Sequence, residues 1–138
     1  MYIAFGNQII DSKDTIDKIE NNSEFKVVKD MSKGSKRDDI LALNLSISID
    51  ILKEMMEDDE ININEYSEEE LFEEYLTLAE EIATDLEEYI PEESILDIRA
   101  YKWDESDNDI KLVIAVTHEE VGEKKLKDIM KRLLTQVE

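Results

Sequence analysis

Residues 54–98 contain nineteen Asp and Glu residues and no Lys, Arg or His. The other parts of the 138-residue chain carry eighteen acidic and sixteen basic residues, so this one segment holds nearly all of the net charge of −21. No carboxylate of the segment can pair with a cation from within it. A charge confined to one region makes a directional field, which attracts basic partners and repels nucleic acid and anionic membranes.

The rest of the composition is that of a folded domain. A chain of this length forms one ordinary domain over residues 1–138, and hydrophobic residues at 41% supply a normal interior. Cysteine is absent, which excludes disulfides, thiolate metal sites and cysteine nucleophiles. No apolar run approaches the roughly 20 residues of a spanning helix, so we expect a cytoplasmic protein with no membrane partner.

Two patterns in the first half of the chain predict strands. In residues 40–49 (ILALNLSISI) large apolar side chains alternate with small and polar ones, which is typical of a strand with one face toward water. Residues 25–31 alternate as well, so the two stretches predict a hairpin. The other expected elements are a strand over residues 2–10 with Gly6 as a bulge, a helix over 11–22 and a loop over 32–39.

In the second half, capping signals mark where helices begin. Ser67 and Glu70 form a capping box, after which apolar residues recur at helical spacing until Pro91, and Thr117 with Glu120 predicts the start of a terminal helix. The expected elements are a short helix over residues 50–57, an acidic connector over 58–66, a long helix over 68–90, a second hairpin of strands over 95–103 and 109–117, and a last helix to 137.

These elements predict an α+β fold in which a mostly antiparallel sheet, built from two hairpins, packs against helices. The order helix-strand-strand-helix occurs over residues 12–57 and again over 67–137, which raises the hypothesis of two similar halves. The repetition concerns element order, because no residue identity between the halves supports a duplication.

The long helix is the first candidate for a binding surface. Its Glu pairs at 73–74, 80–81 and 87–88 recur every seven residues and therefore form a double row away from the apolar stripe. Ten acids over about 35 Å give one charge per about 3.5 Å, close to the ~3.4 Å along one DNA strand. The plain alternative is a solubilising face, although solubility does not require the absence of every Lys and Arg. The candidate partner-binding residues are Glu69, Glu70, Glu73, Glu74, Glu80, Glu81, Asp85, Glu87 and Glu88.

Arg99, Tyr101 and Trp103 alternate with core residues on the second hairpin and are a second candidate partner face, the second-hairpin surface. Arg, Tyr and Trp are enriched at binding hot spots. The alternative is that one of the chain's own helices, or a second subunit, covers this surface. Basic clusters at residues 26–37 and 124–132 leave self-association open, with the acidic helix of another copy as their partner. The overall field disfavours direct binding of nucleic acid.

Nothing in the sequence forms an active site. His118 is the only histidine, and the chain has no Gly-rich phosphate loop, GxSxG or HExxH pattern. Residues 58–69 have oxygen-bearing side chains at the ligand positions of a twelve-residue calcium loop. However, Ile63 occupies the position where the sharp turn needs glycine, and Glu65 occupies a position that is usually apolar. We therefore expect no enzyme activity, no cofactor and no dedicated metal site, with weak divalent-ion binding by this loop as an open alternative.

The sequence favours a non-enzymatic binding protein whose acidic helix occludes a basic surface of the nucleic-acid-binding type. A nuclease, a DNA-processing enzyme or a toxin presents such a surface, and a phage or mobile-element inhibitor or an immunity-type protein would bind it as a nucleic-acid mimic. Complementary charge would speed the encounter, and Tyr66, Tyr75 and Tyr89 would add apolar specificity. The alternative is a structural or adaptor subunit that docks through the second-hairpin surface, with incidental acidity.

Overall fold

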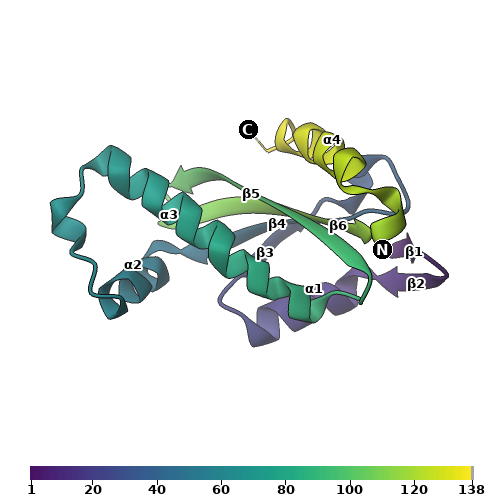
Figure 1. The fold of residues 1–138 in the computed structure, drawn as a ribbon, viewed down its shortest axis with the longest axis horizontal. Coiled ribbons are helices and arrows are strands. Elements are labelled where there is room, and N and C mark those ends of the chain that lie inside the picture. Colours follow the sequence, from purple (N-terminus) through teal and green to yellow (C-terminus); the bar gives the residue numbers. More distant parts are fainter. Residues whose placement is uncertain (138) are drawn as a thin grey trace.

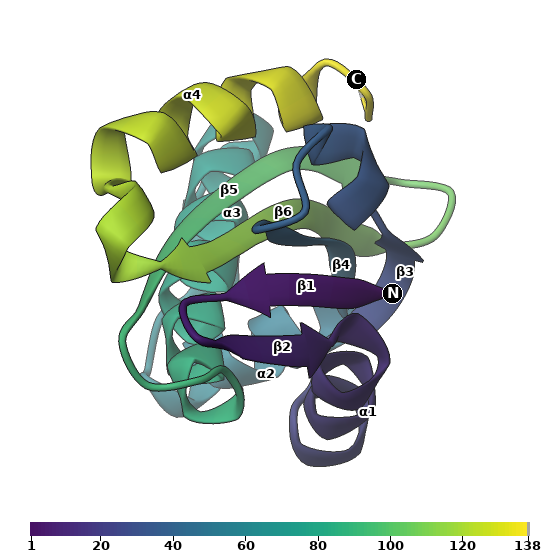
Figure 2. The same cartoon turned by 90° about the vertical axis from the view of Figure 1, so that its right-hand side faces the viewer.

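The computed structural model describes residues 1–137 and has helices on both faces of an antiparallel sheet (Figures 1 and 2). This arrangement confirms the predicted α+β fold. None of the described helices is both long enough and apolar enough to cross a membrane. In chain order the elements are β1 Tyr2–Phe5, β2 Gln8–Asp11, α1 Ser12–Asn22, β3 Lys26–Asp30, β4 Leu41–Ser48, α2 Ile49–Asp58, α3 Glu68–Ala83, β5 Ser94–Asp104, β6 Asp109–His118 and α4 Glu123–Leu134, with short 3₁₀ segments at Ser32–Ser35, Ile63–Glu65, Thr84–Tyr89 and Glu119–Val121.

The main sheet has the strand order β3-β4-β6-β5, and all neighbouring strands are antiparallel. The two predicted hairpins are confirmed as the pairs β3-β4 and β5-β6. Strand β4 joins β6 at the centre of the sheet, where Leu43 lies opposite Ile114. The edges of this sheet are therefore β3 and β5, and α3 packs beside the β5 edge.

The larger core lies between one face of the sheet and helices α1, α2 and α3. Leu43, Leu45 and Leu112 of the sheet belong to one buried cluster with Leu52 of α2 and Tyr75 of α3, and all five side chains are fully buried. Burying one such apolar side chain stabilises a fold by roughly 1.5–3 kcal/mol. This packing fixes the rotation of α3, so it decides which of the α3 side chains face outward.

The opposite face of the sheet carries a second core, which is formed with α4 (Figure 2). Ala42 of β4 is clustered there with Leu126 and Leu133 of α4. The prediction that the small and polar side of residues 40–49 faces water is therefore wrong. Even Asn44 on that side is only 8% exposed, because a helix from the far end of the chain returns to cover this face.

The order helix-strand-strand-helix occurs twice, as α1-β3-β4-α2 and as α3-β5-β6-α4. The helices of the two halves are not equivalently placed, because α1, α2 and α3 pack on one face of the sheet and α4 packs on the other (Figure 1). The similarity of the halves is therefore limited to element order.

Residues 2–10 form a hairpin instead of the predicted single strand with a bulge. The chain turns at Gly6 and Asn7, between β1 and β2, and Gly6 has a φ of +58°. A Cβ atom at this position would also lie 2.8 Å from Cδ2 of His118. The left-handed backbone and the close approach of the histidine ring both require glycine here.

Helix α3 begins as predicted and ends earlier. The Ser67 hydroxyl accepts a hydrogen bond from the Glu70 N–H at 3.2 Å, and the Glu70 carboxylate accepts one from the Ser67 N–H at 3.1 Å, which confirms the capping box. The helix ends at Ala83, whereas the prediction extended it to residue 90. The 3₁₀ segment Thr84–Tyr89 takes its place before Pro91.

The terminal helix begins later than predicted. Strand β6 continues through His118, so α4 starts at Glu123 and the expected capping box at Thr117 does not form. The Thr117 hydroxyl instead donates to the Asp39 carbonyl at 2.8 Å, a contact between segments far apart in the chain.

Candidate partner-binding surfaces

The outward side of α3 is acidic along its whole length. Tyr75, Ala79 and Ala83 are the buried residues of this helix, so helical geometry places its carboxylates on the remaining sides. Six of these seven carboxylates form two rows, and Glu68 precedes them in the first turn. Except for Glu80, which is half-buried, these side chains are exposed. The row beside β5, the β5-side row, consists of Glu69, Glu73 and Glu80, and the second row, the outer row, consists of Glu70, Glu74 and Glu81.

Asp85, Glu87 and Glu88 are exposed as well, but they lie in the 3₁₀ segment after α3. A 3₁₀ helix has three residues per turn instead of 3.6, so these three residues do not continue the two rows in register. The predicted double row is thus confined to α3, where seven acids over about 24 Å give one charge per about 3.4 Å. That spacing still matches the charge spacing along one DNA strand.

The carboxylates of α3 have no ion-pair partners elsewhere in the described fold. By contrast, at the turn between β5 and β6 the Lys111 Nζ lies 2.8 Å from Asp109 and 2.9 Å from Asp107. Burial by itself would lower the pKa of Lys111, but its hydrogen bonds to both aspartates outweigh burial and raise the pKa. The fold therefore pairs acids at this turn and leaves those of α3 unpaired.

Glu80 differs from the other members of the β5-side row because its side chain packs against the edge strand. Burial raises the pKa of Glu80 and outweighs the Arg99 charge and the Ala100 N–H, which both favour the carboxylate, while Asp97 raises the pKa further. The Asp97 carboxylate in turn accepts a hydrogen bond from the N–H of Ile98 at 3.1 Å. The Asp97 carboxylate therefore occupies a donor of an edge strand that would otherwise be open to pairing with another chain.

The structure does not bring Arg99, Tyr101 and Trp103 to one face. A bulge around Tyr101 shifts the register of β5 against β6, so Tyr101 and Trp103 belong to the cores on opposite faces. The Tyr101 hydroxyl donates to Asn44 at 3.2 Å, whereas Trp103 packs edge-to-face on Tyr75, with 5.3 Å between ring centroids. The expectation of a shared second-hairpin surface is wrong, since strict alternation fails at a bulge.

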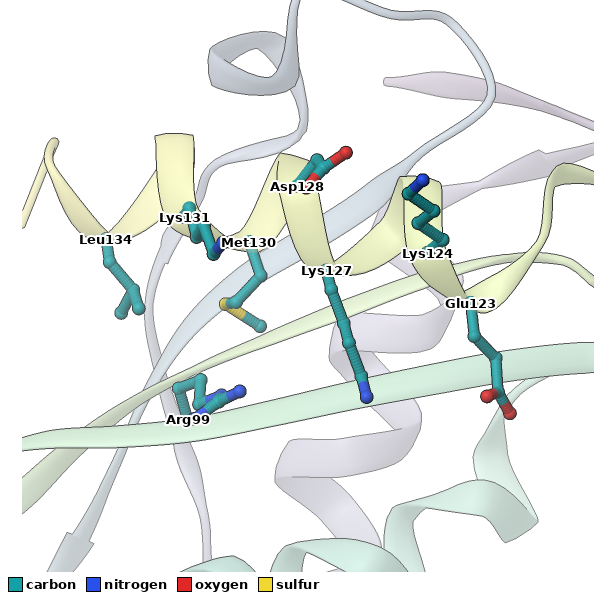
Figure 3. A pocket seen from close by; sticks show the side chains of 8 residues that line it. All are labelled: Arg99, Glu123, Lys124, Lys127, Asp128, Met130, Lys131 and Leu134. Carbon is teal, nitrogen blue, oxygen red and sulfur yellow. The ribbon is translucent and has the colours of Figure 1, made fainter.

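Arg99 instead belongs to a basic groove of about 570 Å³ between β5 and α4 (Figure 3). Lys127 extends from α4 toward β5, and Met130 points into the space between the two elements (Figure 3). Lys124 and Lys131 complete the basic lining. The predicted basic cluster at the end of the chain therefore lies on the face of the sheet opposite α3.

The aromatic residues near the acidic helix are not arranged as the sequence predicted. Tyr75 is fully buried, which removes it from any partner contact, and the half-buried Tyr89 donates its hydroxyl to the Asn22 carbonyl at 3.1 Å. Tyr66 is half-buried and packs against the larger core. The aromatic side chain that α3 exposes is Phe72, at 38%. Phe72 lies at the margin of the apolar stripe of α3, and the spacing of apolar residues alone does not separate such an exposed position from a buried one.

The calcium-like loop at residues 58–69 does not gather its acids into one site. In the described part of the chain, the three acids that come close enough together to hold a metal ion are Asp104, Asp107 and Asp109. The Lys111 ammonium already lies between two of them.

His118 has a structural partner at each ring nitrogen. Its Nδ1 accepts the N–H of Glu120 at 3.1 Å, and its Nε2 lies 3.3 Å from a Glu93 carboxylate oxygen. Its ring also packs edge-to-face with that of Phe5, with 5.2 Å between ring centroids. These contacts join the first hairpin, the start of β5 and the end of β6.

Comparisons with protein families, with curated proteins and with solved structures give no match to this chain. Information about its function therefore comes from its surfaces. Among those described above, the outward side of α3 combines unpaired charge with an exposed aromatic side chain.

Proposed function

We propose that this chain is a non-enzymatic binding protein that covers a basic surface of a partner protein with the outward side of α3. The observation that carries the proposal is the array of exposed carboxylates on that helix, for which the described residues supply no Lys or Arg partner. Solubility alone does not require such an array, because a surface that mixes acidic and basic residues also keeps a protein in solution.

The arrangement also stores repulsion that a cationic partner would relieve. Glu69 with Glu73 and Glu70 with Glu74 are like-charge pairs four residues apart on the helix. Such pairs are generally unfavourable by roughly 0.2–0.5 kcal/mol each. A basic surface laid along α3 replaces this repulsion by attraction, so it speeds the encounter and makes the affinity fall as salt is added.

The charge spacing along α3 favours a partner that binds nucleic acid, because such a partner presents cations at matching intervals. In this proposal the protein occludes the nucleic-acid groove of a nuclease, a DNA-processing enzyme or a toxin. It acts in the cytoplasm as an inhibitor from a phage or mobile element, or as an immunity-type protein. The adaptor alternative needs Arg99, Tyr101 and Trp103 on one surface, and the bulge in β5 separates them.

Charge reversal on α3 tests the proposal. The variant Glu73→Lys, Glu74→Lys, Glu81→Lys changes exposed residues and leaves the half-buried Glu80 intact. Immobilised wild-type protein should retain a basic protein from a lysate of the source cells at low salt and release it at high salt, and the variant should bind that protein more than about tenfold more weakly. The retained protein should lose its binding to a DNA or RNA probe when wild-type protein is added, as measured by a mobility-shift titration.

The matched control carries the same change in net charge at positions away from α3, in the 3₁₀ segment Glu119–Val121 and in α4. Glu119→Lys, Glu120→Lys, Asp128→Lys alters three exposed acids near α4 and should leave capture unchanged. Equal losses in both variants would mean that only the total charge matters. A retained protein that keeps its nucleic acid in the presence of saturating wild-type protein would also overturn the proposal.

A further inference from the structure

A pocket of about 420 Å³ opens between the first turns of α3 and the end of β5. Phe72 and Trp103 supply its aromatic lining, and Glu68, Glu69, Glu73 and Glu105 supply its other side chains. Its size falls within the roughly 300–1,000 Å³ of small-ligand pockets, so it admits one long side chain. The pocket is thus lined by residues from two segments that are some thirty positions apart in the sequence.

The two aromatic residues of the pocket are held in different ways. Trp103 is half-buried, and the fully buried Tyr75 packs edge-to-face against it at an interplanar angle of 88°. Phe72 projects from the helix and is 38% exposed, although it lies one turn before the buried Tyr75. A fixed indole and a water-exposed phenyl ring at one opening form a surface on which a flat or cationic group can stack.

We propose that this pocket receives an arginine side chain of the basic partner, an inference that rests on the proposed function and names its anchoring contact. Aromatic faces attract cations, and four carboxylates without a Lys or Arg ion pair in the described chain surround these two rings. The α3 dipole places about half a positive charge at this end of the helix, which the acids of the first turn outweigh.

The geometry favours arginine over the other cations. A guanidinium is planar, stacks on aromatic rings and donates in parallel to carboxylates, whereas a lysine ammonium is a compact and strongly hydrated charge. A metal ion needs converging carboxylate oxygens, and in the described chain the three acids that converge lie at the β5-β6 turn, outside this pocket. A nucleic-acid base would stack equally well, but its phosphate would meet the field of a protein with a net charge of −21.

Trp103 is the only tryptophan of the chain, so its fluorescence reports on this pocket alone. The probes are a capped Gly-Arg repeat peptide, a Gly-Lys repeat of equal length and charge, and a Gly-citrulline repeat as the uncharged analogue. The wild-type protein should show a saturable change in Trp103 emission with the arginine peptide, weaker binding of the lysine peptide, and no binding of the citrulline peptide.

Phe72→Leu keeps an apolar side chain at this position and removes the aromatic ring. It should weaken binding of the arginine peptide by roughly two- to fivefold, the effect of losing an exposed cation-π contact, and should reduce the preference for arginine over lysine. Tyr2→Leu, which removes a 73% exposed ring from β1 at the opposite end of the molecule, is the matched control and should change neither quantity (Figure 1). Helical circular dichroism checks that both variants are folded.

The outcomes separate the pocket from the function on which it rests. Equal binding of arginine and lysine peptides to wild type and to Phe72→Leu would overturn the arginine pocket and leave the acidic helix as a general docking surface. An emission of Trp103 that does not respond, while calorimetry detects binding of the cationic peptides, would do the same. Tight binding of the citrulline peptide would overturn it as well. If neither cationic peptide binds even at low salt, the proposed function itself fails.

Discussion

At the scale of single residues, the carboxylates of α3 have two different roles. Glu73 and Glu74 are exposed and unpaired, whereas Glu80 packs against the β5 edge close to Arg99 and the N–H of Ala100. Burial raises the pKa of Glu80, so the folded protein disfavours its charged form. Glu80 therefore helps to cover the edge strand at a cost in stability, and the exposed carboxylates remain for a partner.

The first prediction follows from that raised pKa. A carboxyl group whose folded pKa lies above its unfolded value of about 4.3 destabilises the fold at every pH above the folded pKa. This penalty disappears as the pH falls below the unfolded value, where both states are protonated. Glu80→Gln should therefore raise the melting temperature at pH 7 and should leave it nearly unchanged near pH 3. The amide keeps the size of the side chain and an oxygen near the Ala100 N–H.

Glu81→Gln is the control, because it neutralises an exposed neighbour without touching the β5 edge. It should produce a smaller change at pH 7, set by general relief of repulsion. If Glu80→Gln lowers the melting temperature at pH 7, or if the two variants behave alike, the contact with Arg99 and Ala100 outweighs burial and the role assigned to Glu80 is wrong.

At the scale of elements, features that depend on local sequence signals can be predicted, whereas features that depend on long-range packing cannot. The start of α3 depends on Ser67 and Glu70, three residues apart, and it was predictable from the sequence. The strands of both hairpins were predictable because their alternation is also local. The burial of Asn44 was not, since it depends on elements that lie far along the chain. The sequence pattern predicts a bulge at Gly6, although a glycine-containing pair between two apolar stretches is also a hairpin signal.

The candidate site was likewise predictable only where it depends on local sequence signals. The exposed acids of α3 follow from helical periodicity, so their common side could be derived from the sequence. The separation of Trp103 from Arg99 could not, because a single extra residue at Tyr101 reverses the alternation. That same bulge places Trp103 beside Phe72, and the pocket exists only in the folded chain.

The second prediction concerns the capping box of α3. Ser67→Ala removes the hydroxyl that accepts the Glu70 N–H and should lower the free energy of unfolding by about 1 kcal/mol, as N-cap losses generally do. Urea unfolding measures this change. Ser106→Ala, at an exposed position in the β5-β6 turn, is the control and should have almost no effect. Equal effects of the two substitutions would mean that the cap does not stabilise α3.

At the scale of the whole molecule, the charge is divided between the two faces of the sheet. The acidic rows lie on α3, and the lysines of α4 line the groove on the other side. A net charge of −21 opposes compaction because like charges repel one another in the folded state. Salt weakens this repulsion, and it also weakens attraction between α3 and a cationic partner. Folding and binding should therefore respond to salt in opposite directions.

The last prediction uses this opposition. Raising sodium chloride from about 0.01 M to about 0.1 M shortens the screening length from roughly 30 Å to roughly 10 Å. The melting temperature of the wild-type protein should rise over this range, while its affinity for the Gly-Arg peptide should fall. The α3 variant Glu73→Lys, Glu74→Lys, Glu81→Lys should lose most of the salt dependence of peptide binding, because it reverses three carboxylates of the helix. It should keep most of the rise in melting temperature, because six fewer negative charges still leave a net charge of −15. The variant at Glu119, Glu120 and Asp128, with the same net charge, should keep the salt dependence of peptide binding. A melting temperature that falls with salt, or equal salt dependence of binding in the two variants, would show that the carboxylates of α3 do not act as a directed array.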